Sequence, residues 1–183
     1  MTESSASTTY HPTLNLITAA SNVITVSVDY RLAPEYPIPT PYEEQSRESS
    51  GANIAHSMAI LVGLNPINVN LKGVIMLQPY FQGKDPIGPE LGKDRDFKAL
   101  ADLMWKLAGR GRIGLDDPLL NPAMDPLISD FGCSKILLRV AEKDKFTVRS
   151  LNYKKDMEKS GWNGRVELME SKGERHGFFL FNT

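Results

Sequence analysis

The chain has 183 residues, of which 41% are hydrophobic and 23% charged, and its formal net charge is −1. This length fits a single domain over residues 1–183, and the composition is close to that of ordinary globular proteins, which argues against a disordered chain. Scattered charges of both signs argue against a nucleic-acid partner or an anionic membrane surface, and no stretch approaches the roughly 18 apolar residues that span a bilayer.

The first part of the chain predicts a short helix and a buried strand. Apolar residues recur at helical spacing over residues 11–20, and residues 22–28 are rich in β-branched side chains. Residues 31–41 follow with four prolines. Because proline lacks a backbone N–H, this segment is neither a helix interior nor a central strand.

The middle of the chain predicts two helices around one strand. Residues 51–64 favour a helix, 71–77 a strand and 82–95 a loop with three glycines. Residues 96–108 form an amphipathic helix, for which core packing is the expected role. Its apolar face consists of Phe97, Leu100, Leu103, Met104 and Leu107.

The last part repeats the alternation of strand and helix. Residues 135–140 and 165–169 read as strands, with a helix over 147–160 between them. This order predicts an α/β fold with a doubly wound, mainly parallel sheet. In such sheets reactive groups gather at the carboxyl ends of strands, where Asp144 and His176 are found.

A possible nucleophile precedes the helix 51–64, in the segment Arg47-Glu48-Ser49-Ser50-Gly51. The segment resembles the Gly-x-Ser-x-Gly turn between a strand and a helix, although Arg47 replaces the first glycine. Such a serine needs a histidine to take its proton and a carboxylate to orient that histidine. The backbone N–H of Ser50 would supply part of an oxyanion hole.

Each of these residues also has a structural interpretation. Serine and glycine often occur together, Asp144 could cap the next helix, and His176 could be a surface loop residue. The order of serine, acid and histidine along the chain, each beside the right element, favours a catalytic triad of Ser49, Asp144 and His176.

Five segments in register resemble one protein family, the plant carboxylesterases of the α/β-hydrolase fold. These form part of the hormone-sensitive-lipase-like group, which includes the gibberellin receptors and the 2-hydroxyisoflavanone dehydratases. The segments are Val-Asp-Tyr-Arg-Leu-Ala-Pro-Glu (28–35), Ser-Ser-Gly-Ala-Asn-Ile-Ala-His (49–56), Asp-Asp-Pro-Leu-Leu-Asn-Pro (116–122), Ala-Glu-Lys-Asp (141–144) and Gly-Glu-Arg-His-Gly-Phe (173–178).

The resemblance implies hydrolysis of small carboxylic esters through an acyl-enzyme, with Ser49 as nucleophile, His176 as general base and Asp144 as orienting acid. The loop 31–43 would brace the site. We interpret Asp29 and Arg31 as structural, and His56 as a packing or surface residue. A dehydratase-type lyase and a small-ligand receptor stay open as alternatives, although the receptors typically lack the histidine.

The chain departs from this family pattern in three ways. No His-Gly-Gly-Gly oxyanion segment precedes residue 3, the polar residues 40–47 stand where a strand should lead into Ser49, and the family's C-terminal helix has no counterpart. We therefore expect an incomplete α/β-hydrolase domain, and an inactive truncated fragment is a third alternative.

The remaining expectations concern location and cofactors. The single cysteine, Cys133, cannot form an internal disulfide, and we expect it to be a small buried residue. The polar first nine residues do not resemble a signal peptide, which favours a cytoplasmic protein. No metal-ligand spacing or phosphate-binding glycine loop is present, so we expect neither a metal nor an organic cofactor.

Overall fold

A computed structural model of the chain describes residues 15, 19–20, 50–65 and 70–180. The predicted strand 22–28, the loop 31–43 and Ser49 lie outside these residues. Three positions of the predicted helix 11–20 are described, and all three are helical. The described helices and strands are α3 (Ser50–Leu64), β1 (Val74–Leu77), α4 (Arg95–Ala108), β2 (Lys135–Ala141), α5 (Thr147–Lys159) and β3 (Arg165–Ser171).

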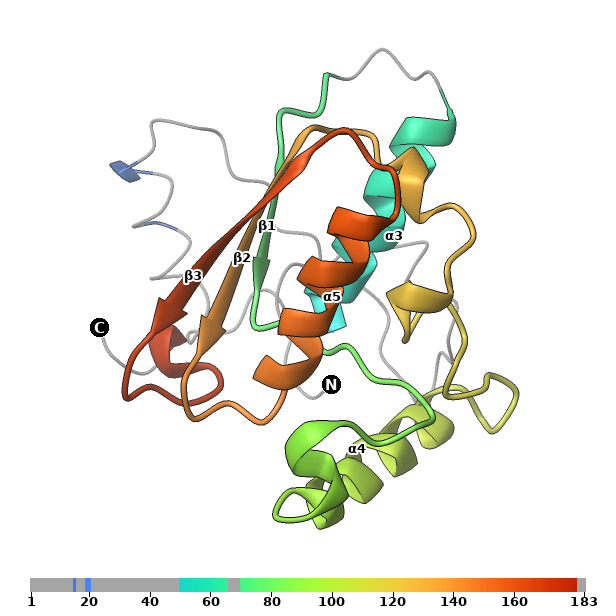
Figure 1. The fold of residues 1–183 in the computed structure, drawn as a ribbon, viewed down its shortest axis with the longest axis vertical. Helices are drawn as coiled ribbons and strands as arrows, with labels where there is room; N and C mark the ends of the chain where they lie inside the picture. Colours follow the sequence, from blue (N-terminus) through green and yellow to red (C-terminus); the bar gives the residue numbers. More distant parts are fainter. Residues whose placement is uncertain (1–14, 16–18, 21–49, 66–69, 181–183) are drawn as a thin grey trace.

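The three strands form one parallel sheet in the order β1-β2-β3 (Figure 1). Ile136 pairs with Val74 on one side and with Val166 on the other, and this register continues to the ends of β1 and β3. The predicted parallel α/β architecture is confirmed. β1 begins at Val74 rather than at residue 71, so only the Val-Ile-Met-Leu core of the predicted strand pairs.

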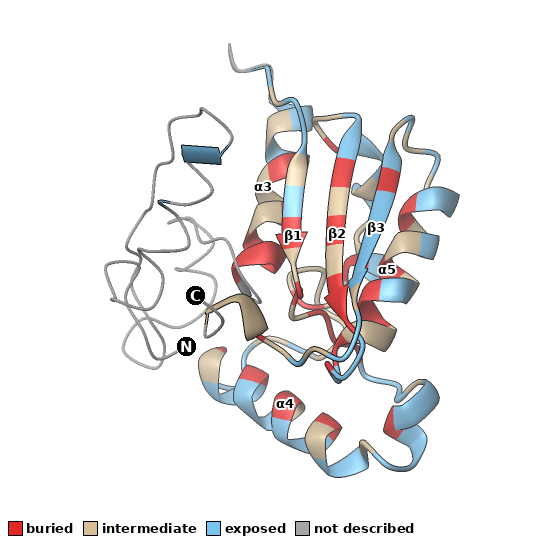
Figure 2. Ribbon diagram, turned by 90° about the vertical axis from the view of Figure 1, so that its left-hand side faces the viewer, coloured by how far each residue is buried: buried red, intermediate tan, exposed pale blue. Residues whose placement is uncertain are grey.

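Helices α3 and α5 pack against one face of the sheet, α3 on β1 and α5 on β2 and β3. The core lies between these layers, and Met76 and Leu138 are fully buried in it. Removing such a side chain from water stabilises the fold by about 1.5–3 kcal/mol. β3 is mostly exposed (Figure 2), since only Val166 of its residues is buried.

Helix α3 comes unusually close to the loop before β2. The N–H of Gly132 donates to the carbonyl of Ala59 at 2.8 Å. A Cβ on Gly63 would lie 1.7 Å from the carbonyl oxygen of Asp130. Only glycine permits this approach, which fixes the end of α3 against the start of the central strand.

Helix α4 lies beyond the carboxyl ends of the strands (Figure 2). The predicted helix is confirmed, but the expectation that its apolar face packs in the core is wrong. The structure buries Ala101 and Trp105 instead, together with Lys98, which forms an ion pair with Asp102 at 2.5 Å. Four apolar residues are about half exposed: Leu100, Leu103, Met104 and Leu107.

Cys133 is half-buried, and its Sγ donates to the carbonyl of Lys135 at 3.4 Å, so the expectation of a buried residue is wrong. It packs at the edge of the main core rather than inside it. Within the described ranges, no helix has the length and apolar character needed to cross a bilayer.

Candidate active site

Asp144 lies in the tight turn between β2 and α5. Its Oδ1 accepts the backbone N–H of Phe146 at 3.0 Å, and its own N–H donates to the carbonyl of Ala141. The carboxylate is almost completely buried, with 2% of its side chain exposed. Asp144 is therefore held rigidly at the end of the central strand, with Oδ2 left for another partner.

That partner is His176. Its Nδ1 lies 2.8 Å from Oδ2 of Asp144, although the two residues are far apart in sequence. The imidazole is 35% exposed, so one edge contacts the buried acid while the ring reaches the surface. Pairing through Nδ1 fixes the orientation of the ring and assigns Nε2 to any proton transfer.

Backbone contacts hold the two loops together. The N–H of Lys143 donates to the carbonyl of Glu174 at 2.8 Å, and the N–H of Glu142 to the carbonyl of Ser171 at 3.1 Å. Oε2 of Glu142 accepts the N–H of Gly173 at 2.7 Å. The turn after β2 and the turn after β3 thus form one hydrogen-bonded unit at the carboxyl edge of the sheet.

The serine of the predicted triad lies just outside the described residues. Ser50, its neighbour, is the first residue of α3, which begins at the same edge of the sheet as the acid and histidine (Figure 1). Asn53, in the first turn of α3, donates from Nδ2 to the carbonyl of Tyr80 at 3.0 Å. Helix N-termini present unpaired N–H groups with partial positive charge, which suits the expected role of Ser50.

A series of aromatic contacts leads from His176 towards α4. The ring of Phe146 lies 5.3 Å from the imidazole, centroid to centroid. Phe146 contacts Tyr80 and Phe97 in turn, each at 5.0 Å. The hydroxyl of Tyr80 donates to the carbonyl of Ala101, and burial raises the pKa of this phenol. An apolar wall therefore connects the candidate base to α4.

His56 has a packing role, as expected. It is fully buried on α3 among Phe81, Phe131 and Tyr153, and its Nδ1 lies 3.0 Å from the hydroxyl of Tyr153. Burial lowers its pKa to about 3, which keeps the ring neutral at physiological pH. A second base at this position is not supported.

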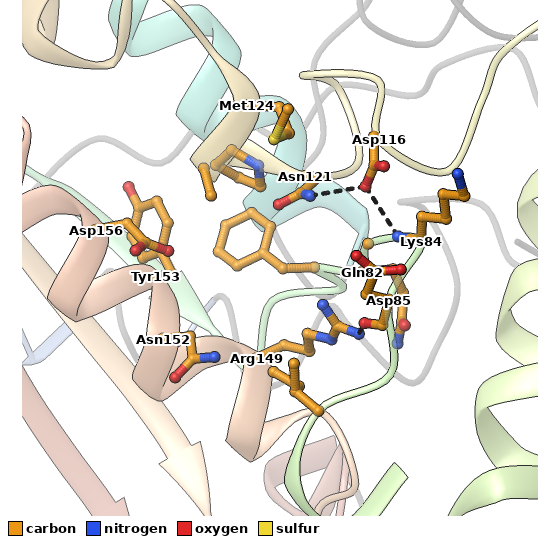
Figure 3. A pocket seen from close by; sticks show the side chains of 15 residues that line it. Gln82, Lys84, Asp85, Asp116, Asn121, Met124, Arg149, Asn152, Tyr153 and Asp156 are labelled. Carbon is orange, nitrogen blue, oxygen red and sulfur yellow. Dashed lines mark hydrogen bonds between the residues drawn. The ribbon is translucent and has the colours of Figure 1, made fainter. Parts of the chain in front are cut away.

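A separate cavity of about 330 Å³ is lined in part by the loop that follows β1. Figure 3 shows Asn121 and the backbone of Lys84 both directed at Asp116, and these hydrogen bonds lower the pKa of that carboxyl. Neither Asp144 nor His176 lines this cavity. Its walls include Phe81, Gln82, Asp85, Met124, Arg149, Asn152 and Asp156.

Sequence reasoning missed Gln78 as a residue of the site. Its side chain hydrogen-bonds to the backbone on both sides of His176. It directly follows β1 at the carboxyl edge, so the rule that drew attention to Asp144 and His176 also applies to it. A metal site is a separate question: within the described ranges, no group of three His, Cys, Asp or Glu side chains could hold an ion.

The sequence matches the profile of a family described as having the alpha/beta hydrolase fold, over residues 2–47 and 48–180. It is 37% identical to Probable carboxylesterase 2 of Arabidopsis thaliana, with 94% of this chain and 63% of that protein covered. It is 33% identical to Probable carboxylesterase 13 of the same plant, covering 98% and 67%.

Solved structures agree on the fold. A carboxyl esterase of the fungus Tuber melanosporum superposes with a TM-score of 0.77 at 16% identity, over 95% of this chain and 65% of that one. A thermostable esterase of Pseudomonas putida gives a TM-score of 0.79 at 17% identity, over 95% and 62%. The chain thus spans about two thirds or less of the length of these proteins.

Proposed function

Because this chain belongs to the α/β-hydrolase fold family, we propose that it hydrolyses small carboxylic esters, with Ser49, His176 and Asp144 as its catalytic triad. Relatives named carboxylesterase support the reaction class. The small net charge of −1 and the apolar wall beside His176 suit an uncharged ester better than an anionic substrate.

The single observation that carries the proposal is the pair formed by Asp144 and His176. A buried carboxylate 2.8 Å from Nδ1 stabilises the imidazolium that forms when Nε2 takes a proton. Structural histidines in loops have no need of a buried, hydrogen-bonded acid. This geometry is what a serine nucleophile requires of its base.

With Ser49 as the nucleophile, the proposed reaction has two stages. Ser49 Oγ attacks the ester carbonyl while His176 accepts its proton, and the N–H of Ser50 stabilises the oxyanion. His176 then protonates the leaving alcohol, which leaves an acyl group on Ser49. Water, deprotonated by the same histidine, releases the acid.

Hydrolysis of short-chain p-nitrophenyl esters tests this function. We expect Ser49→Ala to abolish turnover, whereas Ser57→Ala, which removes a hydroxyl further along α3, should retain it. Equal rates for the unsubstituted chain and Ser49→Ala would reject the proposal. A phosphonate that labels Ser49 covalently would give an independent readout.

Elimination is the second candidate reaction, because one relative is named 2-hydroxyisoflavanone dehydratase, from Glycine max. The two sequences are 31% identical, over 98% of this chain and 68% of that protein. Incubation with a 2-hydroxyisoflavanone and analysis for the dehydrated product would detect it. Product without any ester turnover would make elimination the main activity.

The cellular location of the chain stays a proposal. We expect the cytoplasm, whereas two similar proteins carry other locations in their names. One is a chloroplastic tuliposide A-converting enzyme of Tulipa gesneriana, and the other is mitochondrial Probable carboxylesterase 4 of Arabidopsis thaliana. Microscopy of the full-length protein with a C-terminal fluorescent tag would decide.

A further inference from the structure

Gln78 occupies a strained position directly after β1. Its φ is +47°, in the left-handed region that non-glycine residues rarely adopt, and only 1% of the residue is exposed. Its N–H donates to the carbonyl of Arg139 on β2 at 2.8 Å. A backbone conformation of this kind costs free energy and persists where surrounding contacts impose it, often at functional sites.

The side chain of Gln78 binds both peptide groups next to His176. Its Oε1 accepts the N–H of Gly177 at 2.6 Å, and its Nε2 donates to the carbonyl of Arg175 at 3.1 Å. An amide is suited to this task because it carries an acceptor and a donor at one end. The two bonds fix the backbone on either side of the histidine and therefore the direction of its side chain.

The segment that begins at Gln78 also contacts the other two parts of the site. Through its N–H it is joined to β2, the strand that leads to Asp144. Two residues later, the carbonyl of Tyr80 accepts the Nδ2 amide of Asn53 on α3, the helix that follows Ser49. One short segment thus sets the relative positions of the strand, the helix and the loop that carry the three proposed catalytic side chains.

We propose that Gln78 is a positioning residue that holds His176 against Asp144. This role rests on the proposed function, since it matters for catalysis only if His176 is the base. Without the two side-chain hydrogen bonds, the loop 173–177 keeps its contacts to Glu142 and Lys143 but loses the restraint next to the imidazole. The pair at 2.8 Å would then no longer be the dominant arrangement.

The test compares two glutamines of the same loop by imidazole NMR. Gln78→Met removes both hydrogen bonds while approximately keeping side-chain volume. Gln82→Met is the matched control, because Gln82 is 2% exposed and its Oε1 has no partner in the described part of the chain. The readout is the low-field resonance of the Nδ1–H that pairs with a carboxylate, assigned to His176 by its absence in His176→Asn.

We expect the unsubstituted protein and Gln82→Met to show this resonance and Gln78→Met to lose it, with thermal melts confirming that all three fold. If Gln78→Met does not fold, Gln78→Glu replaces it. That variant keeps the acceptor for Gly177, so we expect the resonance to be lost only above the pH at which the new carboxyl ionises, where the donor to Arg175 is absent.

Ester turnover separates the two proposals. Where hydrolysis is measurable, we expect Gln78→Met to lower kcat by roughly 10- to 100-fold with little change in KM, because misplacing the base impairs the chemical step more than binding. A resonance that depends on Gln78 in a protein without turnover supports the positioning role and rejects the proposed function. A resonance unaffected by Gln78→Met, or absent from the unsubstituted protein, overturns the positioning role.

Discussion

His56 illustrates how burial alone sets the chemistry of a side chain. The imidazole is fully buried on α3, and the loss of solvation lowers its pKa to about 3 from the ordinary value of 6.5. In the unfolded chain the same ring binds a proton below about pH 6.5. Acidification therefore favours the unfolded state, because that state takes up a proton that the folded state excludes.

This difference predicts how stability depends on pH. Between about pH 6 and pH 3, His56 should reduce the free energy of unfolding by about 1.4 kcal/mol per pH unit. The variant His56→Gln stays neutral and can still hydrogen-bond to Tyr153, so it should lack this part of the slope. Urea unfolding of both proteins across this range measures it. Parallel slopes would show that His56 is protonated in the folded state.

Asp144 is the residue whose charge matters most for the proposed reaction. We expect Asp144→Asn to lower kcat about 10⁴-fold, because an amide neither enforces the required tautomer of His176 nor stabilises the imidazolium. Asp156→Asn is the control: this half-buried carboxyl on α5 lines the separate cavity, and burial raises its pKa. Stopped-flow or steady-state ester assays provide the measurement. Similar rates for the two variants would contradict the role of Asp144.

At the scale of elements, the sequence predicted the types of the described helices and strands better than their environments. Runs such as Val74–Leu77 and Lys135–Ala141 have the β-branched and aliphatic composition that a buried parallel strand requires. Helix α4 shows the limit. Its 3.6-residue periodicity identified the helix, but the apolar side is half exposed and the opposite side buries Trp105 and an ion pair.

The two sides of α4 therefore predict different mutational costs. Trp105→Ala should destabilise the protein by about 3–5 kcal/mol, because it removes a buried indole that also donates to the carbonyl of Gly114. Leu103→Gln should change stability by less than about 0.5 kcal/mol, since that leucine is 51% exposed. Chemical denaturation of each variant decides between the two sides. A larger loss for Leu103→Gln would restore the packing role expected from sequence.

The candidate site was predictable where topology alone determines proximity. The turns after β2 and β3 must meet at one edge of a parallel sheet, so Asp144 and His176 were expected there. In the structure, Nδ1 of His176 lies 2.8 Å from Oδ2 of Asp144. Gln78 was not identified because its role depends on a positive φ and on two backbone contacts across the fold. Neither feature leaves a pattern in sequence.

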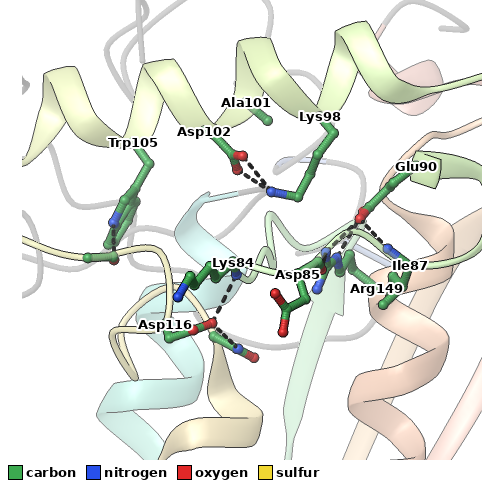
Figure 4. Close-up of polar contacts among 12 residues, drawn as sticks. Lys84, Asp85, Ile87, Glu90, Lys98, Ala101, Asp102, Trp105, Asp116 and Arg149 are labelled. Carbon is green, nitrogen blue, oxygen red and sulfur yellow. Dashed lines mark hydrogen bonds and ion pairs between the residues drawn. The ribbon is translucent and has the colours of Figure 1, made fainter. Parts of the chain in front are cut away.

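Across the whole molecule, buried polar links hold the long connection between β1 and β2 to the sheet layer. Figure 4 shows the main one, in which Arg149 on α5 contacts the loop before α4. Its Nη2 lies 2.5 Å from Oε2 of Glu90, its Nε donates to Oε1 at 2.8 Å, and Nη2 also donates to the carbonyl of Asp85. Both side chains of the ion pair are more than nine-tenths buried. The two groups compensate each other's loss of hydration only while both are present.

This compensation predicts strongly non-additive substitutions. Glu90→Leu alone should cost about 3–5 kcal/mol of unfolding free energy, because it leaves the Arg149 guanidinium buried without its carboxylate. Adding Arg149→Met should recover much of that loss, since a pair of apolar side chains has no charge to desolvate. A double-mutant cycle by urea denaturation measures the coupling, with Lys154→Met on the exposed side of α5 as the control for charge removal.

Because the residues join the loop before α4 to α5, loss of the pair should also lower the unfolding cooperativity of α4 relative to the sheet. Hydrogen exchange of the α4 amides would detect that change. If the two substitutions have additive effects on stability and the exchange rates of the α4 amides are unchanged, this segment is attached through the apolar contacts of Trp105 and Leu120 instead.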